Sequence, residues 1–268
     1  MQLPRHYPKL NVRRIHMHLG KPDHRVTSSP RAHRNFKLAL KTTLWFAAIL
    51  WLILIIDSVM ALGLARYGLR PKHLEGLIGI LTAPLLHSGA EHLFSNTLPL
   101  IVSMTTVLYL YPKSAMRVIP IIWMGSGLLA WIIGRESLHF GASGFVYGLL
   151  AYVFISGILR MDMRSVAVSV MVWFLYGSMI WGVLPIRPNM SWELHLTGAI
   201  LGVAMAIVFR RWDVTPVKRY SWEDDDSVPE WFPQKEPPMR DSSREVSGAQ
   251  NPTEKLSPPN RATDNDPE

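Results

Sequence analysis

Ser143 and His195 are the two residues whose types and surroundings point most directly to chemistry. The serine lies in GASG, residues 141–144, at the start of one long apolar run, and the histidine begins another, HLTGAILGVAMA. A serine hydroxyl is a weak nucleophile until a neighbouring imidazole accepts its proton, and it can then attack a carbonyl carbon. The sequence therefore raises nucleophilic catalysis as a hypothesis. The simpler interpretation is that small residues only allow helices to pack closely.

Two stripes of small residues predict that these two apolar runs form touching helices. Residues four apart lie on one face of a helix, and small side chains on that face let a neighbouring helix approach. The stripes are Gly144 and Gly148 in the first run, and Gly198, Gly202 and Ala206 in the second. Because Ser143 and His195 stand at the beginnings of their stripes, we expect them at the same depth and within reach of each other.

The surroundings of Ser143 favour the catalytic interpretation. Gly141 and Gly144 permit a close approach to the backbone, and the serine falls at a helix N-terminus, where free N–H groups stabilise developing negative charge. Tyr147 lies one turn further along the same face, where its ring can pack against an imidazole. Glu193 precedes the histidine by two residues and so lies on another side of the helix. We therefore expect a two-residue dyad whose imidazole is held by packing, including packing against Tyr147.

A third group of polar residues lies in HSGAEHLFSN, at the start of another apolar run. His92 and Asn96 are four residues apart and share a helix face, while His87 lies in the preceding loop. Polar side chains inside a membrane are costly, so each is a functional candidate. Hydrogen bonds between packed helices are one explanation, and a metal site formed by His87, His92 and His195 is another.

These residues must be positioned by helices that span a membrane. The chain has 268 residues, 49% of them hydrophobic, and the apolar residues are concentrated in long blocks between about 42 and 210. Roughly 20 apolar residues in a helix cross the ~30 Å hydrocarbon core of a bilayer. We therefore predict an all-α polytopic membrane bundle with six transmembrane helices. They are expected at about 42–65, 92–111, 116–134, 143–159, 165–184 and 193–209.

The two ends of the chain are polar and differ in charge. The net charge is +8, but residues 213–268 contain 13 acidic and 7 basic residues, so the positive charge belongs to the rest of the chain. We expect a basic disordered arm over 1–35, a six-helix membrane domain over 36–212 and an acidic, Pro-rich disordered tail over 213–268.

The absence of cysteine excludes disulfides and thiolate metal sites. No basic patch interleaved with aromatic residues indicates a nucleic-acid partner.

Lys and Arg are concentrated in the N-terminal arm and in alternate short loops, which predicts that both termini are cytoplasmic. The helices that begin with the three polar groups would then begin at the outer face. The loop over about 66–91 ends in an apolar stretch, which we expect to lie in the membrane interface. Asp57 falls within the first span, where we expect a structural role with a partner that the sequence does not identify.

The three polar groups, in this order, resemble the motifs of the rhomboid family of intramembrane serine proteases. The matching patterns are H-x4-H-L-x2-N from His87, G-A-S-G-x2-Y from Gly141 and H-x2-G-x3-G-x3-A from His195. The resemblance covers about 66–210 and includes the number of spans. It implies a protease without a cofactor that cleaves transmembrane protein substrates from within the lipid bilayer. It also implies a multi-pass protein of a bacterial cytoplasmic membrane, and it leaves the oligomeric state open.

The resemblance also implies a role for each matching residue. Ser143 would be the nucleophile and His195 the general base. His92 and Asn96, with the backbone N–H of Ser143, would form the oxyanion site. The supporting residues would be Tyr147, stacked on the base, His87 in the first loop, and the glycines Gly141, Gly144, Gly198 and Gly202.

One position departs from the family pattern. Many bacterial members carry a Trp-Arg pair about nine residues before the histidine that corresponds to His87, and this chain has Ile78 and Gly79 there. Interfacial anchoring and substrate handling are therefore expected to differ. Two other functions stay open at this point. One is a non-catalytic rhomboid-like protein that binds membrane clients, and the other is a small transporter or metal-handling protein that uses the three histidines.

Overall fold

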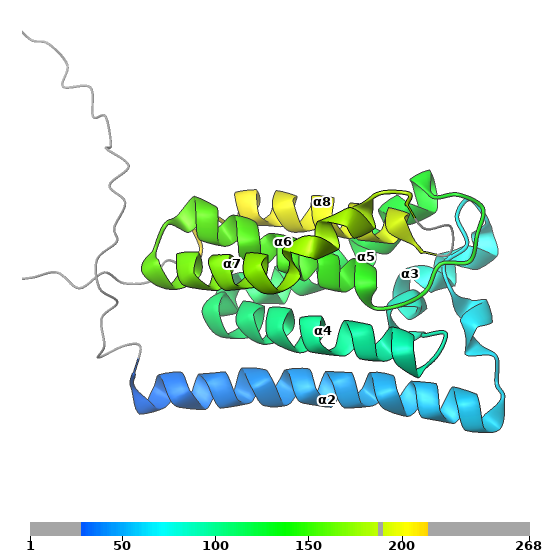
Figure 1. Ribbon diagram of the computed structural model, residues 1–268, viewed down its shortest axis with the longest axis horizontal. Coiled ribbons are helices and arrows are strands. Elements are labelled where there is room, and N and C mark those ends of the chain that lie inside the picture. Colours follow the sequence, from blue (N-terminus) through cyan, green and yellow to red (C-terminus); the bar gives the residue numbers. More distant parts are fainter. Residues whose placement is uncertain (1–27, 187–189, 214–268) are drawn as a thin grey trace, which may run out of the picture. The chain divides into compact units, whose positions relative to one another are not determined.

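The structure, a computed structural model, describes residues 28–186 and 190–213 (Figure 1). The described residues contain helices and no β-strand. Two backbone hydrogen bonds of 2.8 Å form an isolated antiparallel bridge between Leu69 and His139. The all-α prediction is therefore confirmed. The predicted N-terminal arm up to residue 27 and the tail from residue 214 lie outside the described residues.

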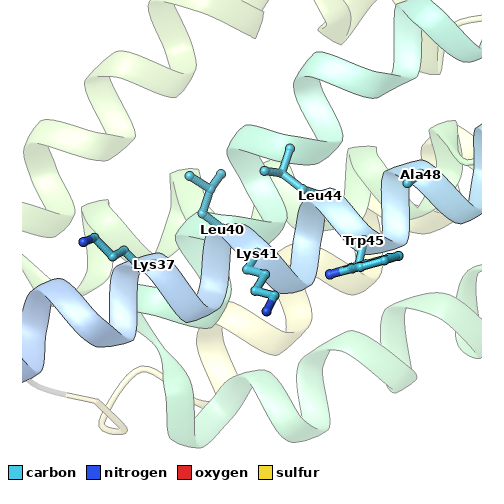
Figure 2. Close-up of a pocket in the computed structure, with 6 residues that line it drawn as sticks. All are labelled: Lys37, Leu40, Lys41, Leu44, Trp45 and Ala48. Atoms are coloured by element: carbon cyan, nitrogen blue, oxygen red, sulfur yellow. The ribbon is translucent and has the colours of Figure 1, made fainter.

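Helix α2 (Pro30–Met60) begins earlier than predicted and occupies residues 30–35, which we had assigned to the disordered arm. Its start is favoured locally, because the Ser29 hydroxyl accepts the Ala32 N–H at 3.2 Å and Pro30 stands at the first helical position. A helix of 31 residues is ~46 Å long, longer than the ~30 Å hydrocarbon core. The basic N-terminal part of the helix, which includes the exposed Lys37 and Lys41 (Figure 2), can therefore extend beyond the hydrocarbon core.

The end of α2 identifies the partner of Asp57. Its Oδ1 accepts the backbone N–H of Leu64 at 3.0 Å, and its carbonyl accepts the N–H groups of Ala61 and Leu62. Ala61 adopts a left-handed conformation that ends the helix. The aspartate thus has the structural role that we expected. The span ends at Met60 rather than at about 65.

The other long helices agree with the predicted spans to within a few residues. They are α4 (Ala90–Leu110), α5 (Pro112–Ile133), α6 (Ser143–Arg160), α7 (Met163–Tyr176), which continues as the 3₁₀ helix η4 (Gly177–Val183), and α8 (Trp192–Val208). Among the described residues, α2, α4, α5, α6 and α7 with η4 are long and apolar enough to cross a membrane. Helix α8 is apolar but slightly shorter. The chain is a multi-pass integral membrane protein with a helical bundle.

Helix α6 is central to the packing, since it contacts α4, α5, α7 and α8, whereas α2 packs beside α4 (Figure 1). The predicted contact between α6 and α8 is confirmed. A Cβ on Gly198 would clash with the carbonyl oxygen of Gly144, and one on Gly202 would clash with that of Gly148. The two backbones therefore lie directly against each other, as the small-residue stripes predicted.

The segment between α2 and α4 folds into short helices that pack on α5. They are η1 (Leu64–Tyr67), η2 (Leu74–Ile78), α3 (Gly79–Thr82) and η3 (Ala83–Leu85). Two indole N–H groups of α5 bond this segment, Trp123 to the Leu81 carbonyl at 3.2 Å and Trp131 to the His73 carbonyl at 2.9 Å. Gly79 faces the backbone of Leu69 with no room for a side chain. At the position where many bacterial members carry the Trp-Arg pair, the loop is therefore held by close packing of its own backbone.

The segment that follows α8 is also bonded to α5. Asp213, which we had assigned to the disordered tail, accepts the backbone N–H groups of Lys113 and Ser114, both at 2.9 Å. It thereby caps the first turn of α5, where unpaired N–H groups and the helix dipole favour a negative charge. The membrane domain thus includes at least this residue of the predicted tail.

Candidate active site

Ser143 and His195 lie side by side. Ser143 is the first residue of α6, and His195 lies in the first turn of α8. Serine Oγ and histidine Nε2 are 2.7 Å apart, and the two residues are 8% and 5% exposed. The contact of the glycine stripes thus brings the helix starts to the same depth. A hydroxyl and an imidazole at this distance can exchange a proton.

The second nitrogen of His195 is held by a backbone carbonyl. Nδ1 lies 2.9 Å from the carbonyl oxygen of Gly182 in η4. Because a carbonyl only accepts, Nδ1 must carry the hydrogen, and the lone pair of Nε2 then faces the hydroxyl of Ser143. This tautomer is the one that a general base requires. The sequence predicts that packing orients the ring, but it does not reveal the carbonyl, since a backbone acceptor has no residue type that marks it.

Tyr147 lies where the sequence predicted. Its ring stacks on that of His195, with centroids 4.2 Å apart and an angle of 6° between the planes. Its hydroxyl donates to the carbonyl of Met179 in η4 at 2.8 Å. Gly182 lies against the edges of both stacked rings, where a side chain would not fit. A Cβ there would collide with the tyrosine hydroxyl and lie 3.3 Å from His195 Nδ1. Segment η4 therefore orients both rings.

The loop before Ser143 is positioned by His87. The backbone N–H of Ala142 donates to His87 Nε2 at 3.2 Å. Burial, together with the neighbouring His92, lowers the pKa of His87 to about 4. The imidazole is therefore neutral at pH 7, as an acceptor must be. His87 thus joins the first loop to the serine loop by a hydrogen bond.

His92 lies beside the same loop. Its ring is 5.1 Å from that of His87 in an edge-to-face arrangement, and its Nδ1 is 3.1 Å from the hydroxyl of Ser88. Gly141 has φ +119°, and a Cβ there would lie 2.8 Å from His92 Cε1 and 3.8 Å from Ser143 Oγ. A glycine is needed at this position both for its backbone conformation and for the space that His92 occupies.

The remaining donors of the predicted oxyanion site lie in α4 and α6. The Asn96 side chain is buried, and its amide donates to the His92 carbonyl in the same helix at 3.0 Å. One of its two N–H groups is therefore used within α4. The backbone N–H of Ser143 stands at the start of α6 and has no acceptor within that helix. It can therefore donate to a ligand at the serine.

The described residues do not form the cluster of ligands that a metal site would need. Over residues 28–186 and 190–213, no three His, Asp or Glu side chains gather closely enough to hold a metal ion. His87 bonds the backbone of Ala142, and His195 bonds Ser143 and Gly182, so each has a nitrogen engaged in the protein.

Comparisons with known proteins agree with the motifs. The family described as Rhomboid domain matches residues 74–212, just over half of the chain. Uncharacterized proteins of Mycobacterium tuberculosis and Mycobacterium bovis are each 34% identical over 174 residues, which cover 62% of this chain and 72% of the relative. An uncharacterized protein of Mycobacterium leprae is 31% identical over 198 residues, covering 69% of this chain and 78% of the relative. The chain belongs to the rhomboid family.

Proposed function

We propose that this chain is an intramembrane serine endopeptidase that hydrolyses peptide bonds in or near transmembrane segments of membrane-protein substrates. The observation that carries the proposal is the 2.7 Å contact between Ser143 Oγ and His195 Nε2. The bond from Nδ1 to the Gly182 carbonyl supports it, because it leaves Nε2 free to accept a proton. Membership of the rhomboid family supports the same class of reaction.

In the proposed reaction, His195 acts first as general base and then as general acid. Its Nε2 takes the hydroxyl proton while Oγ of Ser143 bonds to the carbonyl carbon of the substrate. The imidazolium then gives this proton to the leaving amine, and water hydrolyses the acyl-enzyme by the same proton transfers. The Gly182 carbonyl holds the ring and stabilises its charged form, the part that a carboxylate plays in three-residue triads.

We assign stabilisation of the oxyanion to the backbone N–H of Ser143 and the side chains of His92 and Asn96. The position of the His92 ring against Gly141 supports this assignment for the histidine. For Asn96, the second amide N–H would serve, since the first is bonded to the His92 carbonyl. Loss of one such donor reduces kcat by about 10²–10³ in serine proteases.

We expect the substrate to be a transmembrane segment with small, helix-weak residues at the cleavage site. An α-helix uses its carbonyl groups in its own hydrogen bonds, so the cleaved bond must first leave the helix. The distribution of Lys and Arg supports cytoplasmic termini. In a bacterial cytoplasmic membrane the serine would then lie toward the outer face.

The proposal is tested by cleavage of transmembrane substrates by the detergent-solubilised protein. We expect Ser143→Ala and His195→Ala to be inactive and Ser103→Ala to remain active. Ser103 is a matched control, since it is a buried serine of α4 whose hydroxyl bonds the Leu100 carbonyl in its own helix. Equal turnover by the wild type and Ser143→Ala would refute the proposal. Retention of substrates without cleavage would favour the non-catalytic client-binding function.

A further inference from the structure

Glu193 is a fully buried acidic residue beside the proposed catalytic pair. It lies in the first turn of α8, two residues before His195, and is 1% exposed. Its carboxylate faces Arg135 and His139. Both partners belong to the segment between α5 and α6, which leads directly into the serine loop. The carboxylate thus connects the helix that carries the base to the segment that carries the nucleophile.

Arg135 holds the start of α8 at two points. Its Nε lies 3.2 Å from Glu193 Oε1, and its Nη2 donates to the carbonyl of Met190 at 2.6 Å. Its backbone N–H also points to Oε1, at the longer distance of 3.5 Å. A guanidinium offers several donors in a fixed plane, so these contacts restrain the direction of α8 as well as its distance.

His139 completes the cluster from the other side. Its Nδ1 lies 3.9 Å from Glu193 Oε2, and neither atom has a hydrogen-bond partner among the described residues. Its Nε2 lies 3.2 Å from the Arg135 carbonyl, and its backbone pairs with Leu69 of the first loop. Burial lowers the pKa of His139, although the nearby carboxylate opposes this effect. The ring is therefore neutral at pH 7, and Arg135 is the partner that balances the charge of Glu193.

Stability alone does not explain a buried carboxylate at this position. An apolar side chain of similar size often stabilises a buried site as well as an ion pair does, because the charges lose their hydration. The positive end of α8 favours a negative charge in its first turn, but an exposed acid would gain from that as well. The ion pair with Arg135, whose side chain is 40% exposed, does supply a directional connection between two segments that must keep their relative position.

We infer that Glu193, held by Arg135, is a positioning residue that sets the start of α8 so that His195 meets Ser143. The inference rests on the proposed function and concerns the same site. Glu193 does not contact the serine, so it acts through the placement of His195. Gln at this position keeps the size of the side chain but loses the charge that draws Arg135. A small displacement of the imidazole then lengthens the contact with the serine hydroxyl.

The test is the rate at which a fluorophosphonate probe modifies Ser143 in the solubilised full-length chain. Wild type, Glu193→Gln and Glu136→Gln are compared at a series of probe concentrations, with rates expressed per folded molecule. Glu136→Gln is the matched control, since it removes an exposed acidic charge next to Arg135. For Glu193→Gln we expect the maximal labelling rate to fall by roughly 10- to 100-fold at an unchanged half-saturating concentration, because small misplacements cost rates of this order. The control is expected to label like wild type.

Arg135→Lys provides a second variant that keeps the positive charge and removes the planar group. We expect an intermediate rate for it, and the double variant with Glu193→Gln should label no more slowly than Glu193→Gln alone, because both changes disrupt one contact. Equal maximal rates for wild type and Glu193→Gln, with labelling abolished by Ser143→Ala, would overturn this inference and leave the proposed function intact. Absence of labelling in the wild type would remove the proposed function and this inference with it.

Discussion

His87 accepts the backbone N–H of Ala142 through Nε2 at 3.2 Å, and it can do so only while that nitrogen is unprotonated. The pKa of His87 is lowered from 6.5 to about 4 by burial and by His92. The folded protein therefore binds fewer protons at this site than the unfolded chain between these two pH values. The stability from His87 is present in full above pH 6.5, falls as the pH decreases, and is lost by about pH 4. The difference between the two pKa values corresponds to ~3 kcal/mol in the free energy of unfolding.

The perturbation that tests this reasoning is His87→Asn. Asn offers a side-chain oxygen to the Ala142 N–H but does not titrate in this range. At pH 7 we expect the variant to be less stable by ~1 kcal/mol, because the new hydrogen bond is poorer. On acidification to pH 4 the wild type should lose ~3 kcal/mol more than the variant, so that their order reverses.

The assay is equilibrium unfolding of the detergent-solubilised proteins at several pH values between 4 and 7.5. Groups that titrate in both proteins cancel in the difference between wild type and variant. We expect the difference in unfolding free energy between the wild type and the variant to change by ~3 kcal/mol between pH 7 and pH 4. Parallel curves for the two proteins over the whole range would refute the account of His87 as a neutral acceptor.

Three further predictions follow from close contacts within the helical bundle. Gly182→Ala should reduce cleavage at least 10-fold with little change in expression, because its Cβ would displace the Tyr147 hydroxyl and press on His195. Normal cleavage by this variant would show that η4 does not orient the imidazole. Gly198→Val should lower the thermal unfolding temperature by several degrees, since α8 must move away from Gly144, and an unchanged temperature would contradict the packing. Asp213→Ala should cost ~1 kcal/mol in the free energy of unfolding through loss of the cap on α5, which chemical denaturation can measure against Asp213→Asn.

Much of the bundle and the positions of the predicted site residues could be inferred from the sequence because they depend on local spacing. The small-residue stripes predicted that α6 and α8 touch, since a Gly at every fourth position leaves one face without side chains. From that contact the depth of Ser143 and His195 followed, and so did the stacking of Tyr147, one turn along the same face.

The parts that the sequence did not predict depend on contacts distant in the chain or on the backbone. The Gly182 carbonyl, which orients His195, belongs to a residue with no polar side chain. The ion pair of Glu193 joins it to Arg135, which is 58 positions away. The start of α2 was misplaced because its basic first turns continue the helix beyond the apolar stretch, where hydropathy no longer marks it.

The most direct test of the central claim is the identity of the residue that a fluorophosphonate probe modifies. Intact mass and peptide mapping of the labelled wild type should show a single adduct on Ser143, and His195→Ala should show almost none although its serine is present. An adduct on another residue, or equal labelling of the wild type and His195→Ala, would contradict activation of this serine by the neighbouring imidazole.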